Sequence, residues 1–521
     1  MKNTEYMYVD GIPVAINGEK NMLQVIRKTG VKLPTFCYHT DLSIYGACRM
    51  CMVEDERGNL YTACSTPPRA GMSIKTNTAR LRKYRKNILE LLLANHCRDC
   101  TTCANNKSCK LQDLAVRFNI EGVRFPNRAD DNKVTNSSAS IVFDSGKCIL
   151  CGDCVRTCHE VQNVGAIDFV FRGSKMLIST AFGKPLSETM CVGCGQCAVA
   201  CPTGAITARS EIQKVWDAIS NPSVKTVVQV APAVRVALGN MVGIPEGKDV
   251  SGLIFAALRK MGFDEVFDTS FGADITVLEE SKEFLERLKE GKRLPIITSC
   301  CPAWIQYCEK KHPELMENVS TCRSPMEMFA SVIKEERQER GKKLFHVAVM
   351  PCTAKKFEAQ REEFLGKDGS RNVDAVITTD ELTHMLKEAG ILLNEIDPEP
   401  VDHPYDNASG AAVIFGVTGG VGLRIGVASG LANAEKLLGM LKNGEKFDII
   451  EIMACPGGCV AGGGQPFVHA DVRKTRGKGL YDTDRMLSIR HSESNASVQA
   501  LYDRLLKGRE HELLHVHYKK K

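Results

Sequence analysis

Eight cysteines between residues 148 and 201 repeat one spacing twice. Each run reads C-x2-C-x2-C-x3-C, and Pro202 follows the second run. Thiolates at this spacing hold four-iron clusters in pairs, and the fourth cysteine of each run ligates the cluster of the other run. The spacing therefore predicts one four-iron cluster on Cys148, Cys151, Cys154 and Cys201, and a second on Cys191, Cys194, Cys197 and Cys158.

Four cysteines near the N-terminus are spaced differently: Cys37, Cys48, Cys51 and Cys64. Ten residues separate Cys37 from the C-x-x-C pair formed by Cys48 and Cys51, and twelve residues separate that pair from Cys64. A two-iron cluster needs four thiolates, whereas a zinc site usually has two close cysteine pairs, so the wide gaps favour the two-iron cluster. Segments 8–11 and 14–18 are typical of a hairpin and 21–28 of a helix, which predicts a ferredoxin-like β-grasp domain.

One histidine and three cysteines form the next group, which follows an apolar helical segment at residues 88–94: His96, Cys100, Cys103 and Cys109. This ligand set can hold structural zinc or an iron–sulfur cluster, and the spacing alone leaves both open. Cys97 does not fit the spacing and is interpreted as a spare thiol.

Three apolar, β-branched runs in the second half of the chain end in cysteine, at residues 294–301, 347–352 and 449–459. Helical patterns lie between them, which predicts a mostly parallel sheet whose site gathers at the carboxyl ends of the strands. This places together four thiolates that could hold a four-iron cubane: Cys301, Cys352, Cys455 and Cys459. The alternative is buried structural cysteine, which we expect for Cys308 and Cys322 on apparent helices.

The composition narrows the class of protein. A chain of 521 residues can form three or four domains, and a net charge of +6 without a dense basic stripe does not indicate nucleic-acid binding. Residues 1–10 do not resemble a secretion signal, so 23 cysteines indicate metal in a cytoplasmic protein rather than disulfides. The least polar stretch, 411–434, is rich in glycine and predicts buried strand and loop, not a membrane span.

Three motifs identify a family resemblance: TSCCPAW at 298–304, MPCTAK at 350–355 and EIMACPGGC at 451–459. They resemble the three signatures of iron–iron hydrogenases. The N-terminal groups are similar to the large iron–sulfur subunit of NADH dehydrogenase, which implies a four-iron cluster with one histidine ligand for the His96 group.

The resemblance implies an H-cluster, in which a four-iron cubane is joined through one cysteine to a two-iron unit with carbon monoxide, cyanide and a bridging dithiolate. By motif position, Cys301, Cys352, Cys455 and Cys459 hold the cubane, and Cys459 bridges. Lys355 is expected to donate to a cyanide, as suits an ammonium point charge. The remaining cofactor-binding positions are Met350, Pro351, Met453, Pro232, Ala233 and Ser324.

The resemblance also implies a proton path. Heterolytic cleavage of dihydrogen releases a proton that needs a titratable route out. The positions carried over are Cys300, Glu280, Ser320, Glu283 and Arg287. Without the motifs, the two glutamates and Arg287 would be interpreted as a solvated helix face with an i,i+4 ion pair.

Several positions depart from the better-known monomeric members. Ala303 stands where glycine is usual, Ala233 where serine is frequent, and Met326 where a polar residue is common. A stretch of some tens of residues is also expected to be missing after Val421. These departures resemble members of multi-subunit, pyridine-nucleotide-linked complexes.

The sequence thus predicts a multidomain α/β and α+β protein. We expect a 2Fe-2S domain at 1–78, a four-iron domain with one histidine and three cysteine ligands at 79–124, a two-cluster ferredoxin domain at 139–210 and a two-lobed α/β H-cluster domain at 211–521. The expected activity is the reversible conversion of dihydrogen to protons and electrons.

Other interpretations and the expected partners follow from the same residues. The alternatives are a hydrogen sensor and a non-catalytic electron-transfer subunit. The expected partners are ferredoxin, a flavin-containing subunit like that of NADH dehydrogenase and a small 2Fe-2S subunit. The chain has no Gly-rich nucleotide fingerprint, so NAD is expected to bind elsewhere.

Overall fold

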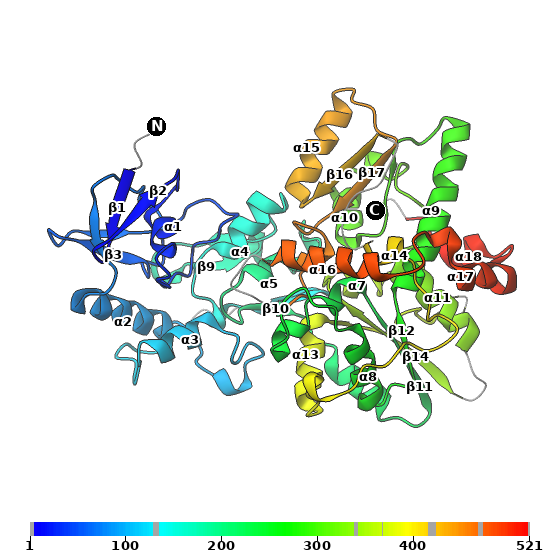
Figure 1. Ribbon diagram of the computed structural model, residues 1–521, viewed down its shortest axis with the longest axis horizontal. Coiled ribbons are helices and arrows are strands. Elements are labelled where there is room, and N and C mark those ends of the chain that lie inside the picture. The colour runs from blue at the N-terminus through cyan, green and yellow to red at the C-terminus, as the bar shows by residue number, and fades with distance from the viewer. Residues whose placement is uncertain are drawn as a thin grey trace.

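The computed structural model describes residues 5–128, 135–337, 342–366, 368–414, 424–466 and 472–518. Figure 1 shows a small N-terminal part in blue at one end and a large C-terminal part in green to red at the other. The cyan segment with helices α4 and α5 lies between them. None of the described helices is long and apolar enough to cross a membrane.

The N-terminal part is a five-stranded sheet in the order β2-β1-β5-β3-β4. Its elements are β1 Glu5–Val9, β2 Ile12–Ile16, α1 Met22–Arg27, β3 Met52–Asp55, β4 Leu60–Thr62 and β5 Ser73–Lys75. The predicted hairpin is β1–β2, with Gly11 at φ 86° in its turn, a conformation that suits glycine. The Asn21 side chain caps α1 by accepting from the Gln24 backbone N–H. The predicted strand–strand–helix order is confirmed.

Two helices flank the His96 group, and short strands belong to the ferredoxin-like centre, the part of the chain that contains the two cysteine runs. Helices α2 Ala79–Ala94 and α3 Lys110–Arg117 flank the His96 group. Strands β6 Thr135–Ser137, β7 Ile141–Asp144 and β10 Ile206–Ala208 form one antiparallel sheet, in the order β10-β7-β6, and β8 Asp168–Val170 pairs with β9 Leu177–Ser179. This sheet therefore begins slightly before residue 139. Each cysteine run contains a short helix, α4 Asp153–Arg156 or α5 Gln196–Ala200.

The C-terminal part contains two parallel sheets, not one. The first has the order β12-β11-β14-β15 and the second β13-β17-β16. The strands are β11 Val224–Val230, β12 Glu265–Asp268, β13 Ile296–Ile297, β14 Lys343–Met350, β15 Ala375–Thr378, β16 Ile425–Ser429 and β17 Ile449–Met453. Buried valine, isoleucine and alanine fill both sheets, as expected for strands covered on two faces. The predicted two-lobed α/β architecture is confirmed.

Helices cover both sheets, and Figure 1 shows α15 against β16 and β17 in one lobe and α8 and α13 beside β11 and β14 in the other. The long helix α9 begins at Ser270 and ends at Glu290. The helices are α6 Ile212–Ile219, α8 Ser251–Met261, α9 Ser270–Glu290, α10 Pro302–Lys311, α11 Pro325–Arg337, α13 Thr379–Glu388, α14 Gly410–Ile414 and α15 Leu431–Lys442.

In the last segment, the first helix packs on α14, the second on α9 and the third on α11. This segment consists of α16 Arg473–Met486, α17 Ala496–Leu501 and α18 Glu510–Leu514. Cys308 lies on α10 as expected, but the expectation of a helix at Cys322 is wrong. Cys322 precedes α11 and forms an isolated antiparallel bridge with His515, because the helix starts only at Pro325, a residue that suits the first turn.

Candidate cluster sites and active site

The four N-terminal cysteines lie close to one another, with Cys51 directly before β3 and Cys64 just after β4. The Cys48 backbone N–H lies 3.4 Å from Cys37 Sγ, and the Cys64 N–H lies 3.5 Å from Cys51 Sγ. The thiols of Cys48 and Cys64 are both within hydrogen-bonding reach of Cys37. This geometry fits four thiolates around a two-iron cluster.

The His96 group contains an orphaned nitrogen. His96 is 6% exposed, and its Nε2 has no hydrogen-bond partner. Its Nδ1 accepts from the Arg98 backbone N–H at 3.2 Å. A buried polar atom without a partner costs free energy, so Nε2 is suited to bind a metal. Cys100, Cys103 and Cys109 lie close to one another.

The two cysteine runs are interleaved as the spacing predicts. A cavity of about 10 Å³ is lined by Cys148, Cys151, Cys154 and Cys201. Burial raises the pKa of Cys148 to about 12, because an unpaired thiolate is costly in an apolar interior. The charge of an iron cluster would offset that cost. The other set is also close together: Cys158, Cys191, Cys194 and Cys197.

The C-terminal cysteines converge on an apolar cavity of about 100 Å³ between the two lobes. It lies at the carboxyl ends of β11, β13, β14 and β17, where parallel sheets place their sites. Its walls include Pro232 and Ala233 on the short helix α7 Pro232–Arg235. The other lining residues that concern the prediction are Cys300, Cys301, Met326, Met350, Pro351, Cys352, Lys355, Met453, Cys455 and Cys459.

Glycines bring this cavity against the ferredoxin-like centre. A Cβ at Gly463 would lie 2.2 Å from the Cys194 carbonyl oxygen and 2.7 Å from Gly195 Cα, so only glycine fits there. Thr353 Oγ1 donates to the Gly193 carbonyl at 2.7 Å. The cluster site of Cys194 is therefore the neighbour of the cavity that Cys455 lines.

Lys355 enters the cavity from the helix α12 Ala354–Glu358. Its Nζ donates to Glu358 Oε2 at 2.6 Å and to the Cys300 carbonyl at 3.3 Å. Burial acts against the ammonium, but the Glu358 charge raises the pKa of Lys355 above its usual value. Ser324 donates to the same carboxylate at 3.1 Å, and among the described residues it is not part of the cavity lining.

Hydrogen bonds link Glu280, Ser320, Glu283 and Arg287, and Glu280 lies close enough to Cys300 for its charge to raise the pKa of that buried thiol further. Burial raises the pKa of Glu280 to about 7, against a hydrogen bond from Ser320. Ser320 Oγ donates to Glu283 Oε2 at 2.8 Å, and Arg287 Nη2 donates to Glu283 Oε1 at 2.5 Å. A carboxyl that titrates near neutral pH is suited to relaying protons.

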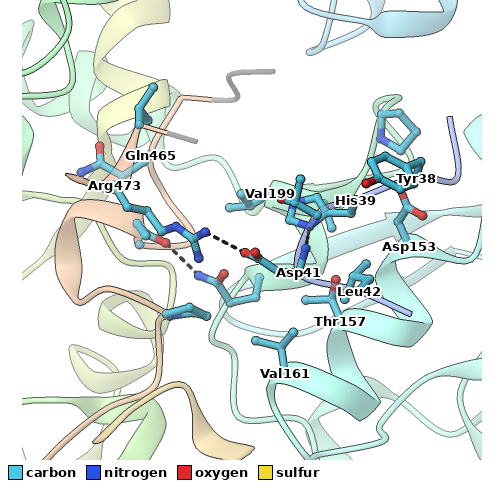
Figure 2. A pocket seen from close by; sticks show the side chains of 18 of the residues that line it. Tyr38, His39, Asp41, Leu42, Asp153, Thr157, Val161, Val199, Gln465 and Arg473 are labelled. Carbon is cyan, nitrogen blue, oxygen red and sulfur yellow. Dashed lines mark hydrogen bonds and ion pairs between the residues drawn. The ribbon is translucent and has the colours of Figure 1, made fainter. Parts of the chain in front are cut away.

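A larger cavity of about 210 Å³ lies where the three parts of the chain meet. Figure 2 shows the ion pair between Asp41, from the N-terminal domain, and Arg473 on α16, which are 2.8 Å apart. Gln196 Nε2 also donates to the Ala461 carbonyl at 2.9 Å. None of the described residues that line this larger cavity is a cysteine, so we interpret the cavity as a packing gap between domains.

Groups of neighbouring cysteines precede a cysteine-lined apolar cavity, and Glu280, Ser320 and Glu283 form hydrogen bonds that end at Arg287. Such a site defines a redox enzyme that handles electrons and protons together. Family comparisons agree. The description "iron only hydrogenase large subunit, C-terminal domain" matches residues 224–423 and 422–463, and "iron hydrogenase small subunit" matches 470–521.

The N-terminal matches follow the cysteine groups. They are a 2Fe-2S cluster-binding domain at 6–79, the iron–sulfur region of NADH-ubiquinone oxidoreductase G at 85–124 and a 4Fe-4S dicluster domain at 147–205.

Relatives of known identity cover nearly the whole chain. The NADP-reducing hydrogenase subunit HndD of Solidesulfovibrio fructosivorans is 39% identical, over 98% of each chain. Iron hydrogenase 1 of Clostridium pasteurianum is 33% identical, over 98% of this chain and 99% of the relative. A solved FeFe hydrogenase of Chlamydomonas reinhardtii superposes with a TM-score of 0.54 at 33% identity, covering 60% of this chain and 99% of that one. The chain belongs to the iron-only hydrogenase family.

The comparisons also agree with the missing stretch after Val421. The large-subunit match breaks into two parts at residues 422 and 423. The alignment with the Solidesulfovibrio relative extends over 576 positions against the 521 residues of this chain, so at least 55 positions have no residue here. Residues 415–423 lie outside the described residues.

Sequence reasoning missed two carboxylates and a histidine at the site. Glu358 holds Lys355 and is three residues away on one helix, so the i,i+3 spacing could have indicated it. Glu279 and His515 contact each other although 236 residues separate them. The sequence contains no local signal for that contact.

Proposed function

We propose that dihydrogen is oxidised and formed in the apolar cavity between the two lobes, with a cubane on Cys301, Cys352, Cys455 and Cys459. Cys459 would be shared with a two-iron unit. The bound H-cluster supplies the redox-active metal at which dihydrogen is split or made. The observation that carries the proposal is the convergence of these thiols with Lys355 on one apolar cavity at four strand ends.

The chain's own residues hold and shield the cofactor and move the proton. Met350, Pro351 and Met453 wall the cavity and keep bulk water out, which strengthens the electrostatic interactions of Lys355. The Cys300 thiol exchanges the proton at the cavity, and Glu280, Ser320 and Glu283 carry it away. A cluster held by Cys194 would lie beside the cavity, as the close packing at Gly463 supports, and would supply a route for electrons when bound.

Infrared spectroscopy tests this assignment, because bound carbon monoxide and cyanide absorb where protein does not. The anaerobically matured protein is expected to show these bands, and Cys459→Ala is expected to lack them. Cys308→Ala is the control, because that buried thiol lies outside the cavity. Unchanged bands in Cys459→Ala would contradict the assignment.

We also propose the full cluster inventory and the domain limits of 1–78, 79–124, 139–210 and 211–521. One two-iron cluster, three four-iron clusters and a six-iron H-cluster amount to about 20 irons. Elemental analysis of reconstituted protein is expected to find that iron and no stoichiometric zinc. His96→Ala should lose about four irons, whereas Cys97→Ala should lose none. Full iron content in His96→Ala, or one zinc per chain, would refute a four-iron cluster at His96.

We propose that the chain works in the cytoplasm with a flavin-containing subunit and a small 2Fe-2S subunit. The name of the Solidesulfovibrio relative, an NADP-reducing subunit, and the NADH-ubiquinone oxidoreductase G match at 85–124 support this. The sequence has no nucleotide fingerprint. The isolated chain should therefore react with ferredoxin or dyes but not with NADH or NADPH.

Purification of the native protein checks this prediction. Nicotinamide-linked activity is expected to appear only when the flavoprotein subunit is added back. A lone, stable chain that turns over with ferredoxin and copurifies with no flavoprotein would contradict the proposed complex.

A further inference from the structure

A buried arginine of the ferredoxin-like centre holds the loop that joins the first two cysteines of the N-terminal group, residues 37–48. Arg156 lies on α4, inside the first cysteine run, and is 8% exposed. Its Nη2 donates to the Cys37 carbonyl at 2.9 Å, and its Nη1 donates to the Ser43 carbonyl. One guanidinium from the ferredoxin-like centre therefore contacts both the beginning and the middle of this loop.

Two further contacts hold the same loop. The Ser43 backbone N–H donates to Glu160 Oε2 at 2.8 Å, and the Ser43 hydroxyl donates to Glu160 Oε1 at 2.5 Å. The Tyr45 ring stacks on the Phe169 ring with centroids 6.2 Å apart, and its centroid lies 5.2 Å from the guanidinium carbon of Arg156. The loop is therefore fixed relative to the four-iron sites of the ferredoxin-like centre.

Cysteines of different cluster sites are brought together at this contact. One apolar cluster of buried residues contains Cys37 of the two-iron site, Cys109 of the His96 group and Cys151 of the first cysteine run. The two-iron site is therefore a neighbour of the four-iron site that includes Cys151. Arg156 lies at their boundary, because it belongs to the same run as Cys151 and donates to the backbone of Cys37.

The charges at this boundary are buried and partly balanced. Arg156 Nη2 also donates to Asp153 Oδ1, and Asp153 is 4% exposed. Lys110, from α3, lies close enough to Asp153 to interact with its charge. The carboxylate therefore offsets part of the Arg156 charge, but the guanidinium remains in direct contact with a cysteine of the two-iron site. Solvent and salt screen such a buried charge much less than an exposed one.

A fixed positive charge at this place acts on the reduction of the two-iron cluster. Reduction adds one electron, and so one negative charge, to the cluster, and no bond forms or breaks. Net charge, hydrogen bonds and solvent exposure set the reduction potentials of iron–sulfur clusters, so a nearby cation favours the reduced state. Arginine suits the position because it keeps its charge when buried and can donate to two carbonyls at once.

We propose that Arg156 is a positioning residue of the electron path. It anchors residues 37–48 to the ferredoxin-like centre, and it makes the two-iron cluster easier to reduce than the same cluster without the guanidinium. The inference rests on the proposed two-iron cluster at the four N-terminal cysteines. The electron concerned passes between this cluster and the neighbouring four-iron cluster that includes Cys151, so that one is oxidised as the other is reduced.

Variants of the reconstituted full chain separate the charge from the anchor. Arg156→Gln removes the charge, whereas Arg156→Lys keeps a charge but cannot reproduce the forked donor. Glu160→Ala removes the hydrogen bonds to Ser43 and no cation. The matched control is Arg473→Gln, the same substitution at another arginine that holds this loop. Arg473 pairs with Asp41 at 2.8 Å, but their side chains are 30% and 37% exposed.

The first measurement is the midpoint potential of the two-iron cluster, from an anaerobic redox titration followed by electron paramagnetic resonance. In Arg156→Gln, the ratio of reduced to oxidised cluster at a fixed potential should fall about tenfold, which is a shift of about 59 mV to more negative potential for one electron. Arg156→Lys and Glu160→Ala should stay near the wild type, because both keep the cation. Arg473→Gln should also stay there, because solvent screens its charge.

The second measurement is hydrogen exchange of the backbone amides in residues 37–48, which reports how firmly the loop is held. Exchange should be about tenfold faster in Arg156→Gln and in Arg156→Lys, because a hydrogen bond to a charged group contributes about 1.4 kcal/mol or more, a factor of about ten. Glu160→Ala should also exchange faster. Only Arg156→Gln should therefore change both the potential and the exchange rate.

Wild-type potential in Arg156→Gln would overturn the role of the charge. An equal shift in Glu160→Ala or Arg473→Gln would overturn it as well, because a loosened loop would then be the cause. Wild-type exchange in both Arg156 variants would refute the anchor. If Arg156→Gln does not assemble its four-iron clusters, Arg156→Lys decides: wild-type potential with faster exchange supports the inference, and any other result overturns it. If the wild type shows no two-iron signal, the proposed cluster is wrong and the inference falls with it.

Discussion

Replacing Cys300 by alanine should lower turnover at least about a hundredfold while the chain keeps its H-cluster, because the thiol is the only described titratable group that lines the cavity without a proposed metal or cyanide to bind. The remaining path from Glu280 onward would then have no donor at the cavity. Turnover with a dye, measured beside iron content and the infrared bands, checks the prediction.

Two matched variants separate proton transfer from cofactor loss. Cys301→Ala should lose the cubane and its iron, although it alters the adjacent residue. Cys308→Ala should change neither, because Cys308 is buried on α10 and donates to the His312 carbonyl. Full activity in Cys300→Ala would show that the proton leaves the cavity by another route.

The cluster sites could be predicted because ligand spacing is local. In the C-x2-C-x2-C-x3-C runs, a short helix and a glycine turn fix the three close thiols, so the sequence determines the geometry within a few residues. Gly152 at φ 77° and Gly195 at φ 70° make those turns. The fourth ligand of each cluster could be assigned because the spacing occurs twice, and the fourth cysteine of each run then belongs to the cluster of the other run.

The active cavity could be predicted only in part. An apolar run that ends in cysteine predicted that Cys301, Cys352 and Cys455 lie at strand ends. These cysteines were expected to converge because parallel strands place their carboxyl ends together. The strand pattern did not reveal which strands pair in which of the two sheets, because strand pairing depends on contacts between distant residues. The same reason hid the contact between His515 and Glu279.

Replacing Lys355 by methionine should destabilise the lobe and disturb the cofactor. The variant would leave the Glu358 carboxylate, which is 1% exposed, without its cation. A second carboxyl, that of the fully buried Glu327, lies near Glu358. Burial and the Glu358 charge already raise the pKa of Glu327 to about 8, so the site cannot hold a second uncompensated carboxylate. Removing one partner of a buried ion pair costs about 3–5 kcal/mol.

The double variant Lys355→Met with Glu358→Gln should recover most of that loss, because no unpaired charge remains. Unfolding in urea, followed anaerobically by the fluorescence of Trp216 and Trp304, both in the C-terminal part of the chain, measures both changes against the wild type. Lys356→Met is the matched control, because Lys356 is also buried and pairs with Glu381 at 2.9 Å but does not line the cavity.

The two lysine variants should therefore have similar stability losses and different spectra. The infrared bands of bound cyanide should shift or disappear in Lys355→Met and in the double variant, since both lack the ammonium group at the cavity, and should stay in place in Lys356→Met. If Lys355→Met kept the wild-type bands, Lys355 would act on stability alone and would not contact the cofactor. If the double variant were no more stable than Lys355→Met, the unpaired Glu358 would not be the source of the loss.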